Sequence, residues 1–321
     1  MSVIAHNQRD LRSLVVFWLF FLLVKPLLAL APVSEGLLRR MSVLEERAAK
    51  DPRVLRGVRI GREVIADAPV ERITPDRPGR DRAAVLYLHG GGFIACGIGT
   101  HRAVASLLSR ELGVPVINTQ YRQCPEAGVG TSVADAYRVY RELRGCGDYD
   151  EIVVAGDSAG GYLAAKVIER AAHDGIAGPD AYLGFSPLLN LAPGARRSGR
   201  RDAMLPIGKI EKLRPFYVRG PEPFTGELDI TADAVAAEFP PAVVVCARHE
   251  ALEKDARDLH AALDRAAVPA QLHIYSGQVH AFPAAVPTLR QSRDAIRVGA
   301  DFVRRALDEA AERAAVESDT A

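Results

Sequence analysis

The residues best suited to chemistry lie in a short glycine-bounded motif around a serine. Residues 156–160 read GDSAG, which fits the pattern G-x-S-x-G, and they directly follow an apolar run at 152–155. A helical pattern over residues 161–173 begins immediately after the motif. Glycines on both sides let the chain turn sharply from strand to helix, and such a turn lifts the serine hydroxyl out of the sheet. The pattern therefore predicts that Ser158 is a catalytic nucleophile.

A second glycine motif, HGGGF at residues 89–93, follows the apolar run 85–88. Acyl transfer passes through a tetrahedral oxyanion, which needs fixed N–H donors. Consecutive glycines let backbone N–H groups approach a substrate, so we expect donors at Gly91 and Gly92 and a third at Ala159. We expect His89 and Gly90 to organise this loop. A phosphate-binding loop is the alternative, but the sequence lacks both GxGxxG spacing and a GK[ST] motif.

The serine hydroxyl is a weak nucleophile, so it needs a base within hydrogen-bond reach. Of the eight histidines, His280 is the strongest candidate, because it lies between the last apolar strand pattern and the last helical pattern. Histidines in terminal or helical positions are expected to be packing or surface residues: His6, His101, His173 and His260. His273 falls within a predicted strand.

The base in turn needs an acid that fixes its tautomer and stabilises the imidazolium. We expect this acid in the loop 248–255, which follows the apolar run 243–247. Glu250 is the preferred residue. Glu253 and Asp255 are alternatives, since either could serve if the loop were shifted by a turn.

Short apolar runs alternate with helical patterns from about residue 58, as in an open α/β sheet. The expected strands are 58–60, 64–65, 70–73, 85–88, 114–119, 152–155, 181–185, 243–247 and 272–275. The expected helices are 102–112, 133–143, 161–173, 254–266 and 289–315. Several strands are continuously apolar, which indicates a mostly parallel sheet buried on both faces. Ligands of such sheets bind beyond the carboxyl ends of the strands.

Composition excludes several classes of partner. Lys and Arg total 41 against 40 for Asp and Glu, so the chain has no excess positive charge that would attract nucleic acid. The four cysteines form no CxxC pair, and we expect neither a zinc site nor any other metal or cofactor. A chain this long needs no disulfides, so reduced thiols in the cytoplasm are the simplest expectation. Oligomeric state cannot be read from the sequence.

Two segments interrupt the strand–helix rhythm. Residues 14–24 are apolar, Lys25-Pro26 follows, and 27–33 is apolar again. A lid helix is preferred here, with peripheral membrane contact through 14–31 as the rival and a signal peptide as a further alternative. Residues 192–238 are rich in Pro and Gly and are expected to form an insertion over the sheet.

Taken together, these motifs resemble the hormone-sensitive-lipase-like esterases, also called bacterial type IV esterases. The resemblance rests on HGGGF at 89–93 and GDSAGG at 156–161, with weaker similarity at YRQCPE (121–126), Asp135, SP (186–187) and VHAF (279–282). It implies an α/β-hydrolase fold with an eight-stranded, mostly parallel sheet, helices on both faces and a helical lid. The implied lid is residues 1–50, and the implied core is 51–321 with the insertion at 192–238.

The resemblance also implies an activity: a serine carboxylesterase acting on short- to medium-chain acyl esters of small molecules, without a cofactor. Asp157 is expected to support the turn rather than react. The alternatives are an amide or acetyl hydrolase, a membrane-attached lipase and a silent ligand-binding protein. The chain departs from the family where Glu250 stands in place of the commoner Asp and Ala281 replaces a glycine.

Overall fold

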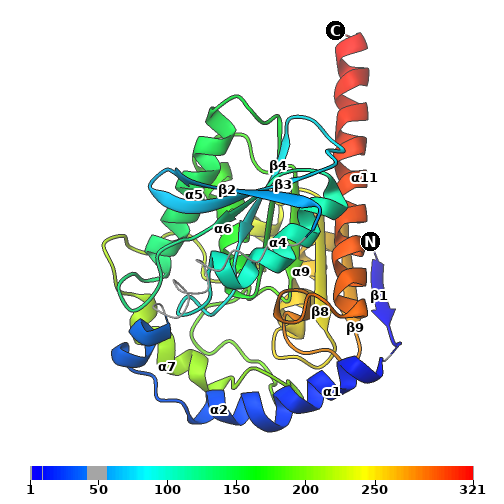
Figure 1. Cartoon of the computed structure of the whole chain (residues 1–321). Helices are drawn as coiled ribbons and strands as arrows, with labels where there is room; N and C mark the ends of the chain where they lie inside the picture. Colours follow the sequence, from blue (N-terminus) through cyan, green and yellow to red (C-terminus); the bar gives the residue numbers. More distant parts are fainter. Residues whose placement is uncertain (1, 9, 42–55, 321) are drawn as a thin grey trace.

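Nine strands form one sheet in the computed structural model, which describes residues 2–8, 10–41 and 56–320 (Figure 1). The strands are β1 (Ser2–His6), β2 (Val58–Ile65), β3 (Ala68–Pro75), β4 (Ala83–Leu88), β5 (Val116–Thr119), β6 (Glu151–Asp157), β7 (Ala181–Phe185), β8 (Ala242–Ala247) and β9 (Ala270–Tyr275). Their spatial order is β1-β9-β8-β7-β6-β4-β5-β3-β2. All neighbours are parallel except the pairs β2/β3 and β3/β5. The predicted mostly parallel sheet is confirmed.

The sheet has one strand more than the eight expected. The two short patterns at 58–60 and 64–65 form the single strand β2, and the additional strand is β1, which the sequence does not predict. β1 pairs in parallel with β9, from Ser2 opposite Gln271 to His6 opposite Tyr275. Without β1, β9 would be an open edge with unpaired backbone groups. The ring of His6 also stacks on that of Tyr275, with centroids 4.0 Å apart.

Helices cover both faces of the sheet (Figure 1). Those outside the insertion are α4 (Ile98–Leu112), α5 (Val129–Gly145), α6 (Ala159–His173), α9 (Glu253–Arg265), α10 (Phe282–Ala285) and α11 (Arg290–Thr320), and the insertion adds the short α8 (Asp233–Ala236). Helices α4 and α11 pack on one face, and α5, α6 and α9 pack on the other. All five expected helices are present, most of them with longer bounds than the sequence predicts.

The strand β4 illustrates why the central strands are continuously apolar. Leu86 and Leu88 lie in the hydrophobic cluster beneath α5 and α6, whereas Val85 and Tyr87 lie in the cluster beneath α4 and α11. All four side chains are fully buried. Successive strand side chains point to opposite faces, so a strand covered on both faces needs an apolar residue at nearly every position.

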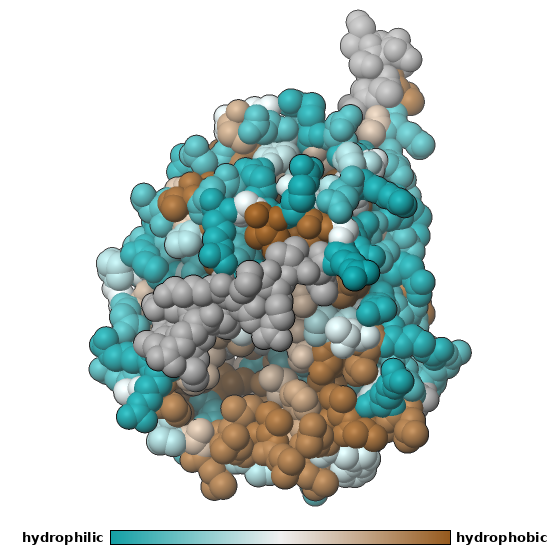
Figure 2. Space-filling model, viewed as in Figure 1, coloured by the Kyte–Doolittle hydropathy of each residue, from teal (hydrophilic) through white to brown (hydrophobic). Residues whose placement is uncertain are grey.

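A continuous helical rod spans Leu11–Leu30 and consists of α1 (Leu11–Leu19), a π-helical stretch η1 (Phe20–Val24) and α2 (Lys25–Leu30). It lies beyond the carboxyl ends of the parallel strands, as does α7 (Gly208–Tyr217) of the insertion (Figure 1). Lys25 Nζ donates to the carbonyl of Gly199 at 2.8 Å, and Lys209 Nζ donates to that of Ala31. The rod and the insertion therefore form one layer, whose apolar surface Figure 2 shows along its lower side.

The expected lid segment 1–50 is divided in the structure. Residues 2–6 belong to the sheet rather than to a lid, because β1 pairs with β9. Residues 11–30 are helical and contact the insertion, whereas residues 42–50 lie outside the described residues. The insertion 192–238 carries the two short helices α7 and α8.

Candidate active site

Ser158 occupies the turn between β6 and α6. Its φ of 49° lies in the left-handed region, which is strained for a residue with a side chain and is typical of a catalytic turn. The backbone of β7 holds this conformation, because Ser158 N–H donates to the carbonyl of Phe185 at 3.0 Å. The Ser158 carbonyl accepts from Leu188 N–H at 2.9 Å. The side chain is partly exposed, as a reacting group must be.

Gly160 allows the turn to pack against the neighbouring strand. A Cβ at Gly160 would lie 1.9 Å from the carbonyl oxygen of Leu88, a backbone atom that cannot move aside. Only a residue without a side chain fits there. This close approach joins the serine turn to the end of β4, from which the HGGG loop begins.

The HGGG loop is folded back on itself. Ile94 and Ala95 both donate to the carbonyl of Gly91 at 3.1 Å. Gly91 has a φ of 113° and a Cβ there would lie 1.9 Å from the Ala95 carbonyl oxygen, so this position also requires glycine. Within the described residues, the N–H groups of Gly91, Gly92 and Ala159 donate to no protein acceptor. Free donors are what an oxyanion would need.

Asp157 holds the HGGG loop to the serine turn. Its buried carboxylate accepts from Tyr87 Oη at 2.9 Å, from Gly90 N–H at 3.0 Å and from His101 Nε2 at 3.3 Å. Burial raises the pKa of Asp157, but the charge and hydrogen bond of His101 and the bond from Tyr87 outweigh it, and the net pKa is lowered. The group is therefore a carboxylate at neutral pH, in a supporting position.

The contact between His101 and Asp157 is not predictable from the sequence, because a histidine in a helical pattern is expected to be a packing or surface residue. The imidazole of His101 reaches Asp157 only because α4 packs against the sheet over β3 and β5. No local sequence signal marks this contact.

His89 is a neutral structural histidine. Burial, with the nearby His101, lowers its pKa to about 3. Nδ1 donates to the carbonyl of Gly90 at 2.8 Å, and Nε2 accepts from Gln123 Nε2 at 3.2 Å, which defines one tautomer. The ring also stacks on Tyr121 with centroids 4.2 Å apart. Both nitrogens are thus engaged, so His89 is unsuited to act as a base.

His280 and Glu250 form a buried pair. The distance from His280 Nδ1 to Glu250 Oε2 is 2.8 Å, and both side chains are almost fully enclosed. Glu250 Oε1 accepts from Ala247 N–H at 3.1 Å, which fixes the carboxylate. Burial lowers the pKa of His280, but the hydrogen bond and charge of Glu250 outweigh it, and the net pKa lies above the ordinary 6.5.

The two alternative acids are held elsewhere. Asp255 accepts from Leu189 N–H at 2.8 Å and pairs with Arg197 at 2.7 Å in a buried ion pair. Glu253 accepts from the N–H of His249 at 2.6 Å and pairs with Arg257 at 2.7 Å. Of the three candidates, the structure therefore brings only Glu250 to His280.

The other ring nitrogen of His280, Nε2, is buried and has no hydrogen-bond partner among the described residues. Buried polar atoms without a partner are rare and often mark functional sites. Four adjacent strands each end shortly before one polar residue: β6 before Ser158, β7 before Ser186, β8 before Glu250 and β9 before His280. Ser186 Oγ accepts from the backbone of Ala281 at 3.0 Å, which ties the histidine loop to the strand next to the serine. Ser158 and His280 thus share one edge of the sheet, although their side chains make no hydrogen bond here.

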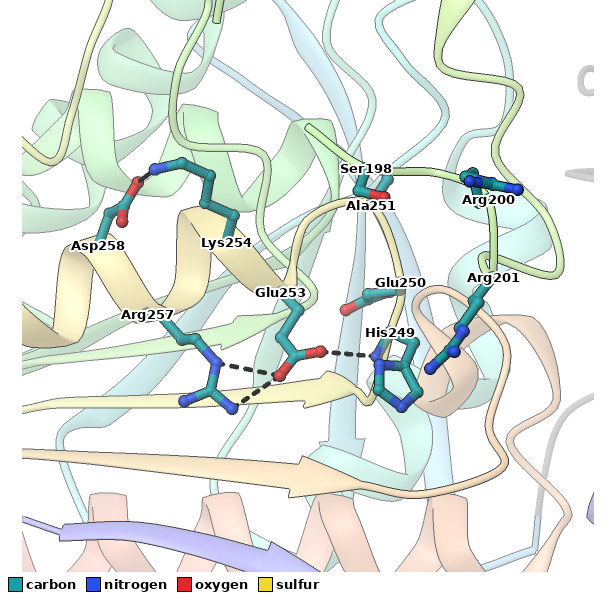
Figure 3. Close-up of a pocket in the computed structure, with 10 residues that line it drawn as sticks. All are labelled: Ser198, Arg200, Arg201, His249, Glu250, Ala251, Glu253, Lys254, Arg257 and Asp258. Atoms are coloured by element: carbon teal, nitrogen blue, oxygen red, sulfur yellow. Dashed lines mark hydrogen bonds and ion pairs between the residues drawn. The ribbon is translucent and has the colours of Figure 1, made fainter. Parts of the chain in front are cut away.

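A cavity of about 860 Å³ is lined by Glu250 together with mostly charged and polar side chains. Figure 3 shows its charged lining, in which Glu253 contacts Arg257 and His249, and Lys254 contacts Asp258. Neither Ser158 nor His280 lines it. This cavity is therefore not the place for an acyl chain.

Aromatic side chains lie beside the HGGG loop. Tyr217 of α7 donates to the carbonyl of Gly92 at 3.3 Å, and its ring lies edge-on to Phe93, with centroids 5.5 Å apart. Phe93 is fully buried, and Phe216 and Tyr217 are nearly so. Helix α7 therefore covers the loop with apolar surface. Within the described residues, no cluster of His, Cys, Asp or Glu could hold a metal ion.

Comparison with known proteins identifies the relatives of this chain. Residues 85–284 match the profile of the α/β-hydrolase fold family. Esterase LipU of Mycobacterium tuberculosis is 34% identical over 238 residues, covering 70% of this chain and 78% of LipU. An acetyl-hydrolase of Streptomyces hygroscopicus is 31% identical, covering 73% of this chain and 79% of the relative. Bovine hormone-sensitive lipase is 32% identical over 154 residues, 20% of its length.

Among solved structures, the esterase EstE5 superposes with a TM-score of 0.80 at 23% identity, covering 93% of this chain and 99% of EstE5. An esterase of the bacterial hormone-sensitive lipase family gives a TM-score of 0.78 at 24% identity, with the same coverage. These likenesses show the fold, and the closer sequence relatives show the family. The chain belongs to the hormone-sensitive-lipase-like esterase family of α/β hydrolases.

Proposed function

We propose that this protein hydrolyses carboxylic esters of small molecules through an acyl-enzyme, with Ser158 as nucleophile, His280 as base and Glu250 as acid. The observation that carries the proposal is the buried Glu250–His280 pair, whose free Nε2 lies at the same sheet edge as the strained Ser158. Family membership supports the same reaction.

In the first half of the reaction, His280 Nε2 takes the proton of Ser158 as Oγ attacks the ester carbonyl carbon. The N–H groups of Gly91, Gly92 and Ala159 stabilise the resulting oxyanion. Each such donor lowers the activation free energy by on the order of 3 kcal/mol. The tetrahedral intermediate then collapses, and the proton on His280 passes to the departing alcohol.

In the second half, water takes the place of the alcohol. His280 removes a proton from this water, whose oxygen attacks the acyl carbon, and the same three N–H groups meet the second oxyanion. Collapse releases the carboxylic acid and returns the proton to Ser158. Glu250 keeps the proton of neutral His280 on Nδ1 and stabilises the imidazolium in both halves.

The proposed substrates carry short- to medium-chain acyl groups. The aromatic cover of α7 over the HGGG loop supports an apolar acyl site close to Gly92. One relative is named an acetyl-hydrolase, which favours acetyl groups as a second candidate. Rates on p-nitrophenyl esters of increasing chain length, alongside acetyl anilides, separate these alternatives.

The cytoplasm is the proposed compartment of the catalytic domain. All four cysteines lie within the described residues and are free thiols, which fits a reducing environment. The balanced charge of the chain argues against nucleic acid as a partner.

Replacing the nucleophile tests the proposal directly. We expect Ser158→Ala to lower kcat for p-nitrophenyl butyrate by at least about 10⁴-fold, because the covalent route is lost. The circular dichroism spectrum and melting temperature should stay close to those of the wild type. A correctly folded variant that keeps the wild-type rate would rule out Ser158 as the nucleophile.

A further inference from the structure

The helical rod Leu11–Leu30 exposes an apolar stripe that no described part of the chain covers. Trp18, Leu22 and Leu27 are 54%, 62% and 70% exposed. The outward large apolar residues recur at helical spacing along one side of the rod: Leu11, Val15, Trp18, Leu19, Leu22, Leu23, Leu27 and Leu30. A helix on the surface of a water-soluble domain normally presents polar residues on its outer face. Figure 2 shows this stripe as a continuous apolar surface.

The opposite side of the rod is packed as in any folded domain. Phe17, Phe20 and Phe21 lie against the hydrophobic cluster beneath α4 and α11. Ser13 is buried and donates to Gln291 Oε1 of α11 at 3.0 Å. The rod is therefore docked on the protein by one face and apolar on the other, which is the arrangement of a helix shared between a domain and a lipid surface.

Both ends of the rod are held by the same domain. Before it, β1 is paired along its length with β9. Near its end, Lys25 Nζ donates to the carbonyls of Gly199 and Asp202, and Lys209 reaches the carbonyl of Ala31. Twenty residues of helix span about 30 Å, enough to cross a bilayer. Crossing would put β1 and the sheet on opposite sides, however, and would break their pairing.

Unpaired cations flank the stripe. The exposed Arg200 and Arg201 lie between Gly199 and Asp202, the two residues that Lys25 contacts. They also line the charged cavity of Figure 3, where the other cations pair with acids. Arg12 is exposed at the start of the rod. Within the described residues, none of these three arginines forms an ion pair, so they are available for anionic headgroups.

We propose that the stripe binds the surface of an anionic phospholipid bilayer, with the rod lying in the plane of the interface and the whole protein on one side. The apolar residues enter the boundary between headgroups and acyl chains, and the flanking arginines contact lipid phosphates. A second copy of the chain fits less well, because a two-fold contact through this stripe brings like-charged arginines of both copies to the interface.

The rod is also linked to the candidate active site. Asp202, whose carbonyl accepts from Lys25, uses Oδ2 to accept from Ala251 N–H at 2.7 Å, directly after Glu250. A membrane-bound rod therefore holds the carboxyl-end edge of the sheet toward the bilayer. Substrates dissolved in or released from the membrane would meet that edge first.

Flotation of the full-length protein with vesicles tests the proposal. It needs no enzymatic activity, so its outcome is independent of the proposed ester hydrolysis. We expect flotation with vesicles that mix phosphatidylcholine and phosphatidylglycerol, and weaker flotation with phosphatidylcholine alone. Absence of flotation with both compositions would overturn the proposal.

A triple variant tests the stripe itself. Trp18→Gln, Leu22→Gln and Leu23→Gln remove exposed apolar side chains and leave Phe17, Phe20 and Phe21 of the inner face in place. Trp18 also lies edge-on to Phe17 and Phe21, so the melting temperature of the variant is measured as well. Bound protein should fall by roughly tenfold or more. Val64→Gln, an exposed valine in β2 away from the rod, is the matched control and should bind as the wild type does. Equal binding of the triple variant would contradict the proposal. So would a lipid-independent dimer that the triple variant dissociates, since the stripe would then serve a second copy.

The two neighbouring arginines, Arg200 and Arg201, need a separate test. Arg200→Gln with Arg201→Gln should reduce binding to anionic vesicles to the level seen with neutral ones. Arg304→Gln with Arg305→Gln, which removes the same charge from α11, should leave the preference for anionic lipid intact. If the two double variants lose that preference equally, net charge rather than this site explains it.

Labelling tests the in-plane geometry. The test uses inverted membrane vesicles from cells that produce the variant Val3→Cys, which places a thiol in the exposed part of β1. A membrane-impermeant maleimide should label this introduced thiol and the exposed Cys146 from the same side, as mapped by peptide mass spectrometry. Labelling of only one of the two thiols would show that the rod crosses the membrane.

Discussion

At the scale of single residues, Glu250 decides how His280 behaves. The carboxylate lies 2.8 Å from Nδ1, and the bond from Ala247 N–H keeps it in place. Its charge holds the pKa of His280 above 6.5 despite burial. The base must be neutral to accept the serine proton, so activity should fall as pH drops through this raised pKa.

Glu250→Gln should therefore change both rate and pH dependence. Loss of the carboxylate lowers the pKa of His280, so the acid limb of kcat/KM should move to lower pH. The plateau should fall by on the order of 10³–10⁴-fold, because the tautomer and the imidazolium lose their support. A pH–rate profile from pH 5 to 9, compared with Glu253→Gln as the matched control, measures both effects. An acid limb that stays in place would separate Glu250 from the titrating base.

His101 should matter for stability through Asp157. His101→Leu leaves the buried Asp157 carboxylate without this hydrogen-bond partner, which costs about 2 kcal/mol in the free energy of unfolding. Urea denaturation of this variant, beside His173→Leu at an exposed position, measures the difference. Equal stability of the two variants would mean that Asp157 does not depend on His101.

The sequence determines the neighbourhood of these residues better than their contacts. The position of Glu250 after an apolar strand is enough to select the right loop, but Glu253 and Asp255 are separable from it only by their partners in three dimensions. His101 carries no local signal at all, because its contact depends on how α4 packs.

At the scale of elements, the serine turn and the HGGG loop act as one unit. The two segments approach so closely that Gly160 has no room for a side chain beside Leu88. Asp157 joins them a second time through Gly90. The oxyanion donors and the nucleophile are thus carried on the ends of two adjacent strands, β4 and β6.

Gly160→Ala should separate these elements. The added Cβ would force the turn away from Leu88, so we expect a loss of at least about 2 kcal/mol in unfolding free energy and a fall in kcat of two orders of magnitude or more. Gly145→Ala is the control, since its Cβ would meet nothing within 4 Å. Wild-type activity in Gly160→Ala would show that the close approach is dispensable.

Strands of the core are predictable because each is buried on both faces and reads as an apolar run. Strand β1 is not, because its five residues, SVIAH, are mostly exposed and gain their place only from the open edge of β9. The same strand explains why the character of the apolar segment 14–31 cannot be decided from the sequence. Its two ends are tied to one body by long-range contacts.

At the scale of the whole molecule, chemistry and surface converge on one side. The candidate site lies beyond the carboxyl ends of β6 to β9, and the helical rod and α7 form the layer outside it (Figure 1). The near-neutral net charge of +1 gives no long-range attraction, so contact with a bilayer would depend on the local stripe and its arginines.

In the proposed reaction, Ser158 is the nucleophile and His280 activates it. The Oγ of an activated serine displaces p-nitrophenolate from diethyl p-nitrophenyl phosphate. The resulting diethylphosphoryl ester is stable, so intact-protein and peptide mass spectrometry can locate it. We expect one diethylphosphoryl group per chain, on Ser158, formed far more slowly in His280→Ala. An adduct on a different residue, or equal labelling rates in the wild type and His280→Ala, would contradict these roles.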